Sequence, residues 1–146
     1  AVSIEDDVVA GRLPGIPIVI GQSVQDTFAR FPRVSDSMSF PGGLKYQLEE
    51  DRFRGTHIIV DGGHVTGIIT RRMNLHGLIL GQANQTEVRE ALGEPVSTLN
   101  MDRATAEQYW LPQGKLEEYR YDAHVLRMLF DDTDTLQALW LSALGV

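Results

Sequence analysis

The chain of 146 residues contains no cysteine, and this absence removes several kinds of chemistry. Disulfide bonds, thiolate nucleophiles and cysteine-ligated zinc are all excluded. Long apolar runs are also lacking, because no stretch approaches the roughly 18 consecutive apolar residues that a membrane-spanning helix requires. The acidic start, AVSIEDDVV, does not resemble a signal peptide. We therefore expect no transmembrane segment in a chain whose composition, 42% hydrophobic and 23% charged, is typical of a globular protein.

Positive charge is scarce as well. The 13 lysines and arginines are outnumbered by 20 acidic residues, which gives a formal net charge of -7. The resulting field opposes binding to nucleic-acid phosphates and to anionic membranes, so neither is an expected partner. The same field would speed association with a basic protein surface.

Two segments of the chain resemble each other. IPIVIGQSVQDTFARFP near the start is echoed by LHGLILGQANQTEVREALGEP after the middle. Such self-similarity indicates a duplicated supersecondary unit that packs against its copy. We predict a loosely packed N-terminal leader over residues 1–15, a first αβ repeat over 16–72 and a second over 73–146, packed as one compact unit.

The first repeat is predicted to contain a strand, a helix and a β meander in that order. IPIVI at 16–20 has strand character, and Ser23 followed by Asp26 is typical of a helix start. Pro32 ends that helix. Alternating stretches on both sides of the DGG sequence at 61–63 predict a tight hairpin.

The second repeat follows the same order. Asn84 as N-cap, with Glu87 as its capping-box partner, predicts a helix that ends at Gly93 and Pro95. EQYWL, KLEEYRY, HVLRMLF and TLQALWL are interpreted as strands, and an insertion falls around 97–107. The predicted fold is α+β, with two tandem helix-plus-antiparallel-β-meander repeats that form a helix-backed, concave antiparallel sheet.

No catalytic or metal signature of similar strength occurs. The stretch Asp132-Thr133-Asp134-Thr135 mimics a phosphatase D-x-D-x-T motif, but only 11 residues follow it, too few for the other ligands of a magnesium site. We interpret it as an acidic turn. There is no G-x-S-x-G elbow, and no HxH or HxxxH spacing joins the histidines, so we expect no catalytic residue, metal or cofactor. The histidines are His57, His64, His76 and His124.

Aromatic side chains on the predicted strands are the main candidates for a binding surface. In EEYRY, alternation sends Tyr119 and Tyr121 to one face and Arg120 to the other. Tyrosine, tryptophan and arginine dominate interface energetics, although each aromatic can instead belong to the core. The candidate partner-binding residues, acidic loops included, are Tyr46, Asp51, Phe53, Asp61, Tyr109, Trp110, Tyr119, Arg120, Tyr121, Asp131 and Asp132.

The second repeat also carries the pattern G-x-x-(S/N)-x-x-(D/E), an apolar helical stripe, G-x-P, aromatic strands and a final F-D-D hairpin. In these features the chain resembles the β-lactamase inhibitor protein and the small outer-membrane lipoprotein (SmpA/OmlA) module, over about residues 16 to 142. The resemblance implies helical segments packed on an antiparallel sheet, tandem copies as in the inhibitor, and a periplasmic or cell-envelope location. The matching residues are Gly81, Val88, Leu92, Gly93, Pro95, Tyr109, Trp110, Phe130, Asp131 and Leu136.

These observations favour a non-enzymatic protein-binding module that inhibits or neutralises a partner, as an inhibitor or toxin-immunity factor does. The expected partner is another protein, such as a secreted enzyme or toxin with a basic cleft. Two alternatives stay open. One is a cell-envelope assembly or scaffold module, which the lipoprotein resemblance implies, and the other is a small-ligand carrier or hydrolase that uses the concave face.

Overall fold

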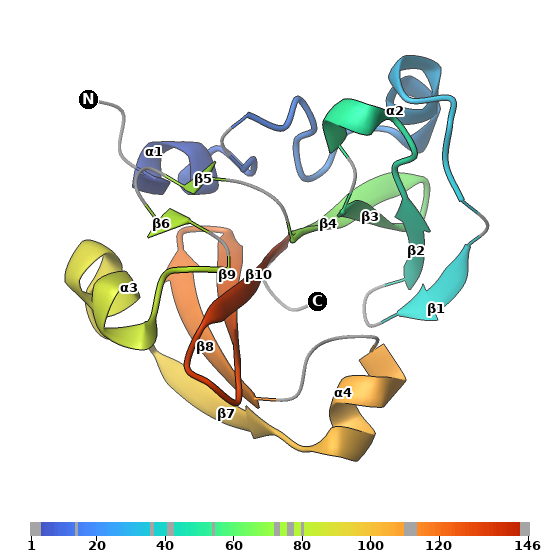
Figure 1. Ribbon diagram of the computed structural model, residues 1–146. Coiled ribbons are helices and arrows are strands. Elements are labelled where there is room, and N and C mark those ends of the chain that lie inside the picture. Colours follow the sequence, from blue (N-terminus) through green and yellow to red (C-terminus); the bar gives the residue numbers. More distant parts are fainter. Residues whose placement is uncertain are drawn as a thin grey trace.

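One eight-stranded antiparallel sheet dominates the computed structural model (Figure 1). The residues that the structure describes are 4–13, 15–35, 37–40, 43–53, 55–71, 74–75, 78–79, 81–109 and 114–143. The strands of the sheet follow the order β1-β2-β3-β4-β10-β9-β8-β7. Their bounds are β1 (Met38–Phe40), β2 (Gly43–Gln47), β3 (Thr56–Asp61), β4 (His64–Thr70), β7 (Ser97–Met101), β8 (Gly114–Tyr121), β9 (His124–Asp131) and β10 (Leu136–Ala143).

Two meanders meet at the centre of this sheet. Strands β1 to β4 are neighbours in chain order, and so are β7 to β10. Antiparallel pairing of β4 with β10 joins the two sets, with Thr70 opposite Leu139 and Gly67 opposite Ser142. A separate two-stranded pair consists of β5 (Asn74–Leu75) and β6 (Leu78–Ile79).

The helices are short and lie around the sheet. They are α1 (Ile4–Val9), α2 (Val24–Arg30), α3 (Gln85–Leu92), α4 (Arg103–Tyr109) and the 3-10 turn η1 (Asp51–Phe53). Within the described residues, no helix has the length and apolarity needed to cross a membrane.

The predicted α+β fold of two helix-backed repeats is therefore wrong. The molecule is built mainly from strands, and its sheet runs without a break across the junction between β4 and β10. The prediction overestimated the helices, because the longest of them, α3, has 8 residues. Backbone hydrogen bonding along the sheet, and not helix packing, supplies most of the regular structure.

Helix ends follow the capping chemistry that the sequence indicates. The Oγ of Ser23 accepts a hydrogen bond of 3.1 Å from the Asp26 amide at the start of α2. Asn84 and Glu87 form a reciprocal capping box at the start of α3, and Gly93 ends that helix with a positive φ of 88°. These local predictions are confirmed.

Two predicted strands are wrong. Residues 16–20 belong to no strand of the described structure, and the Ile20 amide donates to the Gly11 carbonyl over 2.7 Å. In EQYWL, residues 107–109 belong to α4, where the Ala106 amide bonds to the Asp102 carbonyl at 2.9 Å. The remaining residues of EQYWL lie outside the described part of the chain. Helix-forming residues at 104–108 override the apolar pattern here.

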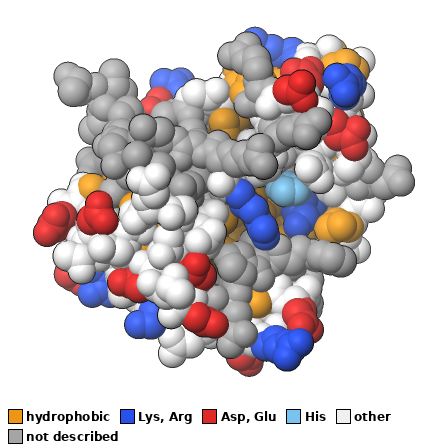
Figure 2. Space-filling model, viewed as in Figure 1, with side chains coloured by type: hydrophobic (Ala, Val, Ile, Leu, Met, Phe, Trp, Pro, Cys, Tyr) orange, Lys and Arg blue, Asp and Glu red, His pale blue; other side chains and the backbone are white. Residues whose placement is uncertain are grey.

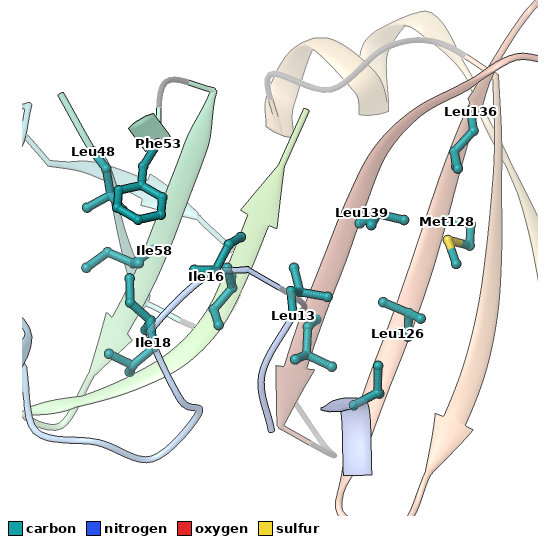
Figure 3. Close-up of a cluster of buried hydrophobic side chains, with 14 of the residues drawn as sticks. Leu13, Ile16, Ile18, Leu48, Phe53, Ile58, Leu126, Met128, Leu136 and Leu139 are labelled. Carbon is teal, nitrogen blue, oxygen red and sulfur yellow. The ribbon is translucent and has the colours of Figure 1, made fainter. Parts of the chain in front are cut away.

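The N-terminal segment is part of the core, which corrects the expectation of a loosely packed leader. Val8, Leu13 and Ile18 are fully buried, and they belong to the main hydrophobic cluster. Figure 3 shows Leu13, Ile16 and Ile18 lying between side chains from the two halves of the sheet. The segment thus covers one face of the sheet across the junction of its two meanders.

Candidate functional site

The two faces of the sheet carry different clusters. The outer face holds the main core, covered by the N-terminal segment together with α2 and α3 (Figure 1). The opposite surface, which we call the inner face, carries a second buried cluster to which α4 contributes Ala106. This cluster consists of Phe40, Ile59, Ile69, Ala106, Leu116, Leu129, Ala138 and Trp140.

The sheet curves around the inner face. Phe40 lies on β1 and Trp140 on β10, four strand positions apart, which on a flat sheet is about 19 Å. Their ring centroids are only 5.1 Å apart, in an edge-on arrangement. The inner face is therefore concave, and Figure 1 shows α4 on this side.

A row of mostly polar side chains crosses the inner face. Strand register aligns one residue from each strand between β2 and β8, and every second residue of a strand points to the same face. In sheet order they are Gln47, His57, Ile69, Trp140, Arg127 and Glu118. Polar groups on a face that also holds an apolar cluster are unusual in a plain core, and they indicate a site.

Arg127 is held between Trp140 and Glu118 in this row. Its guanidinium carbon lies 4.4 Å from the ring centroid of Trp140, and its Nη1 donates to the Ser142 Oγ over 2.7 Å. The Nε donates to the Glu118 carboxylate at 3.2 Å. Burial lowers the pKa of Arg127, and Glu118 opposes that effect. The Nε1 of Trp140, by contrast, is buried without a hydrogen-bond partner among the described residues.

A cavity of about 350 Å³ opens beside this row, at the end of the sheet formed by β1 to β4. Figure 2 shows Lys or Arg side chains on both sides of a His in the middle of the molecule, with hydrophobic side chains next to them. The cavity is lined by Ser35, Met38, Lys45, Gln47, Gly55, His57 and Arg71. Among the described residues of the lining, the charged side chains are those of Lys45 and Arg71, both cationic.

Lys45 is the most unusual of these residues. It is only 5% exposed, and its Nζ lies 4.8 Å from the ring centroid of Phe40. In the described part of the chain no carboxylate forms an ion pair with it. Burial lowers the pKa of Lys45, and the positive charge of Arg71 lowers it further. Lysines are rarely buried unless they are paired, so this side chain is strained electrostatically.

His57 has a similar environment. Its pKa is lowered to about 4, first by burial and then by the charges of Lys45 and Arg71. The ring is therefore neutral at pH 7. Its Nδ1 is buried and makes no hydrogen bond with any residue that the structure describes. The two cations and the neutral imidazole line one cavity, where they can together bind an anion.

Several of the sequence-predicted site residues have core roles instead. Phe53 and Tyr119 are buried in the outer-face core, at 8% and 4% exposed, and Tyr46 and Tyr121 pack against that core. Phe53 meets Phe31 edge-on, with ring centroids 5.3 Å apart. Phe53 and Tyr119 therefore pack between the sheet and the segments that cover it. A partner-binding role for the half-buried Tyr46 and Tyr121 stays a prediction.

The other predicted residues are dispersed. Asp51, Asp61, Arg120 and Asp132 are exposed on different elements, and the structure does not bring them together. Tyr109 lies at the end of α4. Trp110 lies outside the described residues, as does His76.

The acidic turn that follows β9 is confirmed as a structural feature. The Asp131 carboxylate accepts hydrogen bonds from the Thr133 hydroxyl, from the amides of Thr133 and Thr135 and from the Gln137 side chain, at 2.6 to 3.1 Å. These bonds, that of the Thr133 hydroxyl first, lower the pKa of Asp131. A larger cavity of about 760 Å³ lies beside this turn, with Asp102, Asp132 and Asp134 in its lining. Because the Asp131 carboxylate is engaged in closing the turn, we do not place the site there.

Glu117 anchors α3 to the outer face. Its side chain is fully buried and accepts hydrogen bonds from the Nη2 and Nε of Arg89 at 2.9 and 3.2 Å, and also from Gln85. The Tyr119 hydroxyl donates to the Gly93 carbonyl over 3.1 Å. Burial, and then the negative charge of Glu117, raise the pKa of Tyr119. This network is satisfied internally and links helix to sheet.

Sequence reasoning missed the residues of the inner face. Alternation in GLKYQ places Lys45 and Gln47 on the same side, and the hairpin register sets Gln47 opposite His57. The chain has only two lysines, Lys45 and Lys115, and both lie within strands. The available signal was therefore the alternation that places Lys45 and Gln47 on one side of β2. The prediction relied instead on aromatic residues, several of which pack on the opposite face.

Neither a family model nor a curated protein sequence matches this chain. Among solved structures, it is similar to a DUF4309 family protein (YjgB) from Bacillus subtilis, with a TM-score of 0.65 and 13% identity, over 97% of this chain and 93% of that one. It is also similar to a cysteine-rich secretory protein from Staphylococcus aureus, with a TM-score of 0.51 and 9% identity, over 86% of this chain and 44% of that one. At these identities the similarity shows a shared fold. The resemblance to the inhibitor and lipoprotein modules stays a prediction.

Proposed function

We propose that this chain is a non-enzymatic binding module that holds an acidic segment of a partner protein on the inner face of its sheet. The observation that carries the proposal is the gathering of Lys45, His57, Arg71 and Arg127 on one concave surface of a chain whose net charge is -7. Positive groups so placed, against the overall charge, favour a negatively charged occupant.

The composition of the inner face also supports a protein partner. Trp140 and Arg127 are stacked at its centre, and these residue types contribute strongly to interface energies. A concave surface lets an extended segment contact several strands at once.

The partner's binding segment is therefore acidic, whereas the sequence led us to expect a basic cleft. A basic cleft was expected because the acidic loops near Asp51, Asp61 and Asp131 were interpreted as the binding elements. Asp51 and Asp61 lie on separate elements, and Asp131 is engaged in its own turn. We therefore place acidic groups on the partner. Capture of such a segment would block any other use of it, which is how an inhibitor or immunity protein acts.

Selection from a random peptide library tests this function. The protein should enrich acidic peptides, and the amide chemical shifts that change on binding should lie on β2, β3, β4, β9 and β10. The variant Lys45→Met/Arg71→Met should lose the enrichment. Lys115→Met/Arg30→Met removes the same charge from exposed positions and should keep it. Peptides without acidic enrichment, or shifts confined to the outer face, would contradict the proposal.

A further inference from the structure

We propose that the cavity lined by Lys45, His57 and Arg71 is a carboxylate-binding site for a glutamate or aspartate side chain. The inference rests on the proposed function, because it assigns the group through which the acidic segment is held. It also stands on the geometry of the cavity itself.

Lys45 has no counter-ion among the described residues. At 5% exposed, this ammonium has lost most of its water, and its contact with the Phe40 ring replaces only part of that stabilisation. Arg127, the other enclosed cation of the inner face, has Glu118 as a partner at 3.2 Å. Lys45 has no such partner in the described chain, although its side chain lines an open cavity. A carboxylate brought by a ligand would complete the ion pair.

Two other residues of the cavity can bind an anion together with Lys45, namely His57 and Arg71. Lys45, His57 and Arg71 lie close together because they line the same cavity, and the charge of Arg71 lowers the pKa of both other groups. A guanidinium fork matches the two oxygens of a carboxylate, and the ammonium provides a point charge beside it. The neutral His57 ring carries one N–H donor, and no described residue accepts from or donates to its Nδ1. Gln47 adds an amide to the lining.

The groups that line the cavity suit a carboxylate better than a phosphate. A phosphate group carries three strong acceptor oxygens and close to two negative charges, whereas a carboxylate carries two oxygens and one charge. With His57 neutral, the cavity offers one imidazole N–H beside its two cations. Met38 adds an apolar wall that suits the methylene groups of an acidic side chain. A volume of about 350 Å³ accommodates such a side chain with part of its backbone.

The test uses two matched probes. N-acetyl-glutamate methylamide carries one side-chain carboxylate, and N-acetyl-glutamine methylamide has the same shape without charge. Titration of the full chain, followed by the His57 imidazole and the amide signals of β2 and β3, should show saturable binding of the glutamate probe only. Lys45→Met and Arg71→Gln should each weaken that binding by about tenfold or more, and Lys115→Met should leave it unchanged.

The contrary results are distinct. Equal binding of both probes, or undiminished binding by folded Lys45→Met and Arg71→Gln, would overturn the carboxylate site. Tighter binding of inorganic phosphate than of the glutamate probe would overturn the choice of carboxylate. If the probe does not enter the cavity while acidic peptides still bind the inner face, this inference fails and the proposed function stands. If neither the glutamate probe nor acidic peptides bind, both this inference and the proposed function are contradicted.

Discussion

The ammonium of Lys45 lies 4.8 Å from the centroid of the Phe40 ring, on the concave face of an acidic protein. A cation–π contact of this kind stabilises a buried ammonium by about 2 kcal/mol, less than the cost of removing its water. The free protein therefore carries an electrostatic cost at Lys45 that a bound anion would relieve.

Removal of the Lys45 charge should stabilise the free protein. Lys45→Met keeps most of the apolar stem and abolishes the buried charge, so the free energy of unfolding should rise by about 1 kcal/mol or more. Urea denaturation measures the change. Lys115→Met at an exposed position should stay within about 0.5 kcal/mol of the original protein. A destabilised Lys45→Met would show that the ammonium has a structural partner.

His57 should make the fold sensitive to acid. Its folded pKa of about 4 lies below the ordinary value of 6.5, so between these pH values the unfolded chain binds more protons than the folded one. Stability should be full above pH 6.5 and fall by up to about 3 kcal/mol as the pH approaches 4. His57→Gln should remove this part of the pH dependence, and His64→Gln at the exposed hairpin should not. Urea denaturation midpoints measured across this pH range would show the difference between the variants. Identical pH profiles for His57→Gln and His64→Gln would contradict the assignment of this pH dependence to His57.

Substitutions of Glu117 and Arg89 should have strongly coupled effects on the free energy of unfolding. Arg89→Met leaves a fully buried carboxylate without its cation, whereas Glu117→Leu leaves an arginine that is 37% exposed and can reach water. Arg89→Met should therefore be the more destabilising change. The double variant should recover much of the loss, because neither charge remains. A double-mutant cycle by chemical denaturation measures the coupling, and strict additivity would rule it out.

Two glycines at the starts of β2 and β8 should resist substitution. A Cβ at Gly43 would lie 2.0 Å from the Val60 carbonyl oxygen, and one at Gly114 would lie 1.8 Å from that of Phe130. Both have positive φ, at 145° and 155°. Gly43→Ala and Gly114→Ala should each cost about 3 kcal/mol or more, since backbone must move. Gly62→Ala has a positive φ but open space, so about 1 kcal/mol is expected. Equal losses at all three positions would contradict this account.

Local structure was predictable from the sequence where it depends only on residues that are close together in the chain. The caps at Ser23 and Asn84 depend on residues three positions away, and the hairpin at 61–63 depends on its own turn. The strand over 16–20 was mispredicted because a strand needs a partner, and apolar character does not reveal whether one exists. Pairing of β4 with β10 joins distant parts of the chain, so no local pattern specified which strands meet at the junction.

The candidate site was less predictable than the turns. Alternation correctly separated Tyr119 from Arg120, but it does not say which face is covered. That depends on the N-terminal segment, whose Leu13 packs on the outer face. Curvature then brings Phe40 to Trp140 across four strand positions. The inner face is a consequence of long-range packing that period-two patterns do not contain.

The central claim is that a carboxylate pairs with Lys45, and one measurement addresses it directly. The chain has only two lysines, so protein labelled with ¹³C at lysine Cε gives two side-chain signals, which Lys115→Met assigns. In free protein, titration should show a pKa of Lys45 below the ordinary 10.5. Saturation with N-acetyl-glutamate methylamide should raise that pKa. A Lys45 titration that the probe does not alter would contradict the claim.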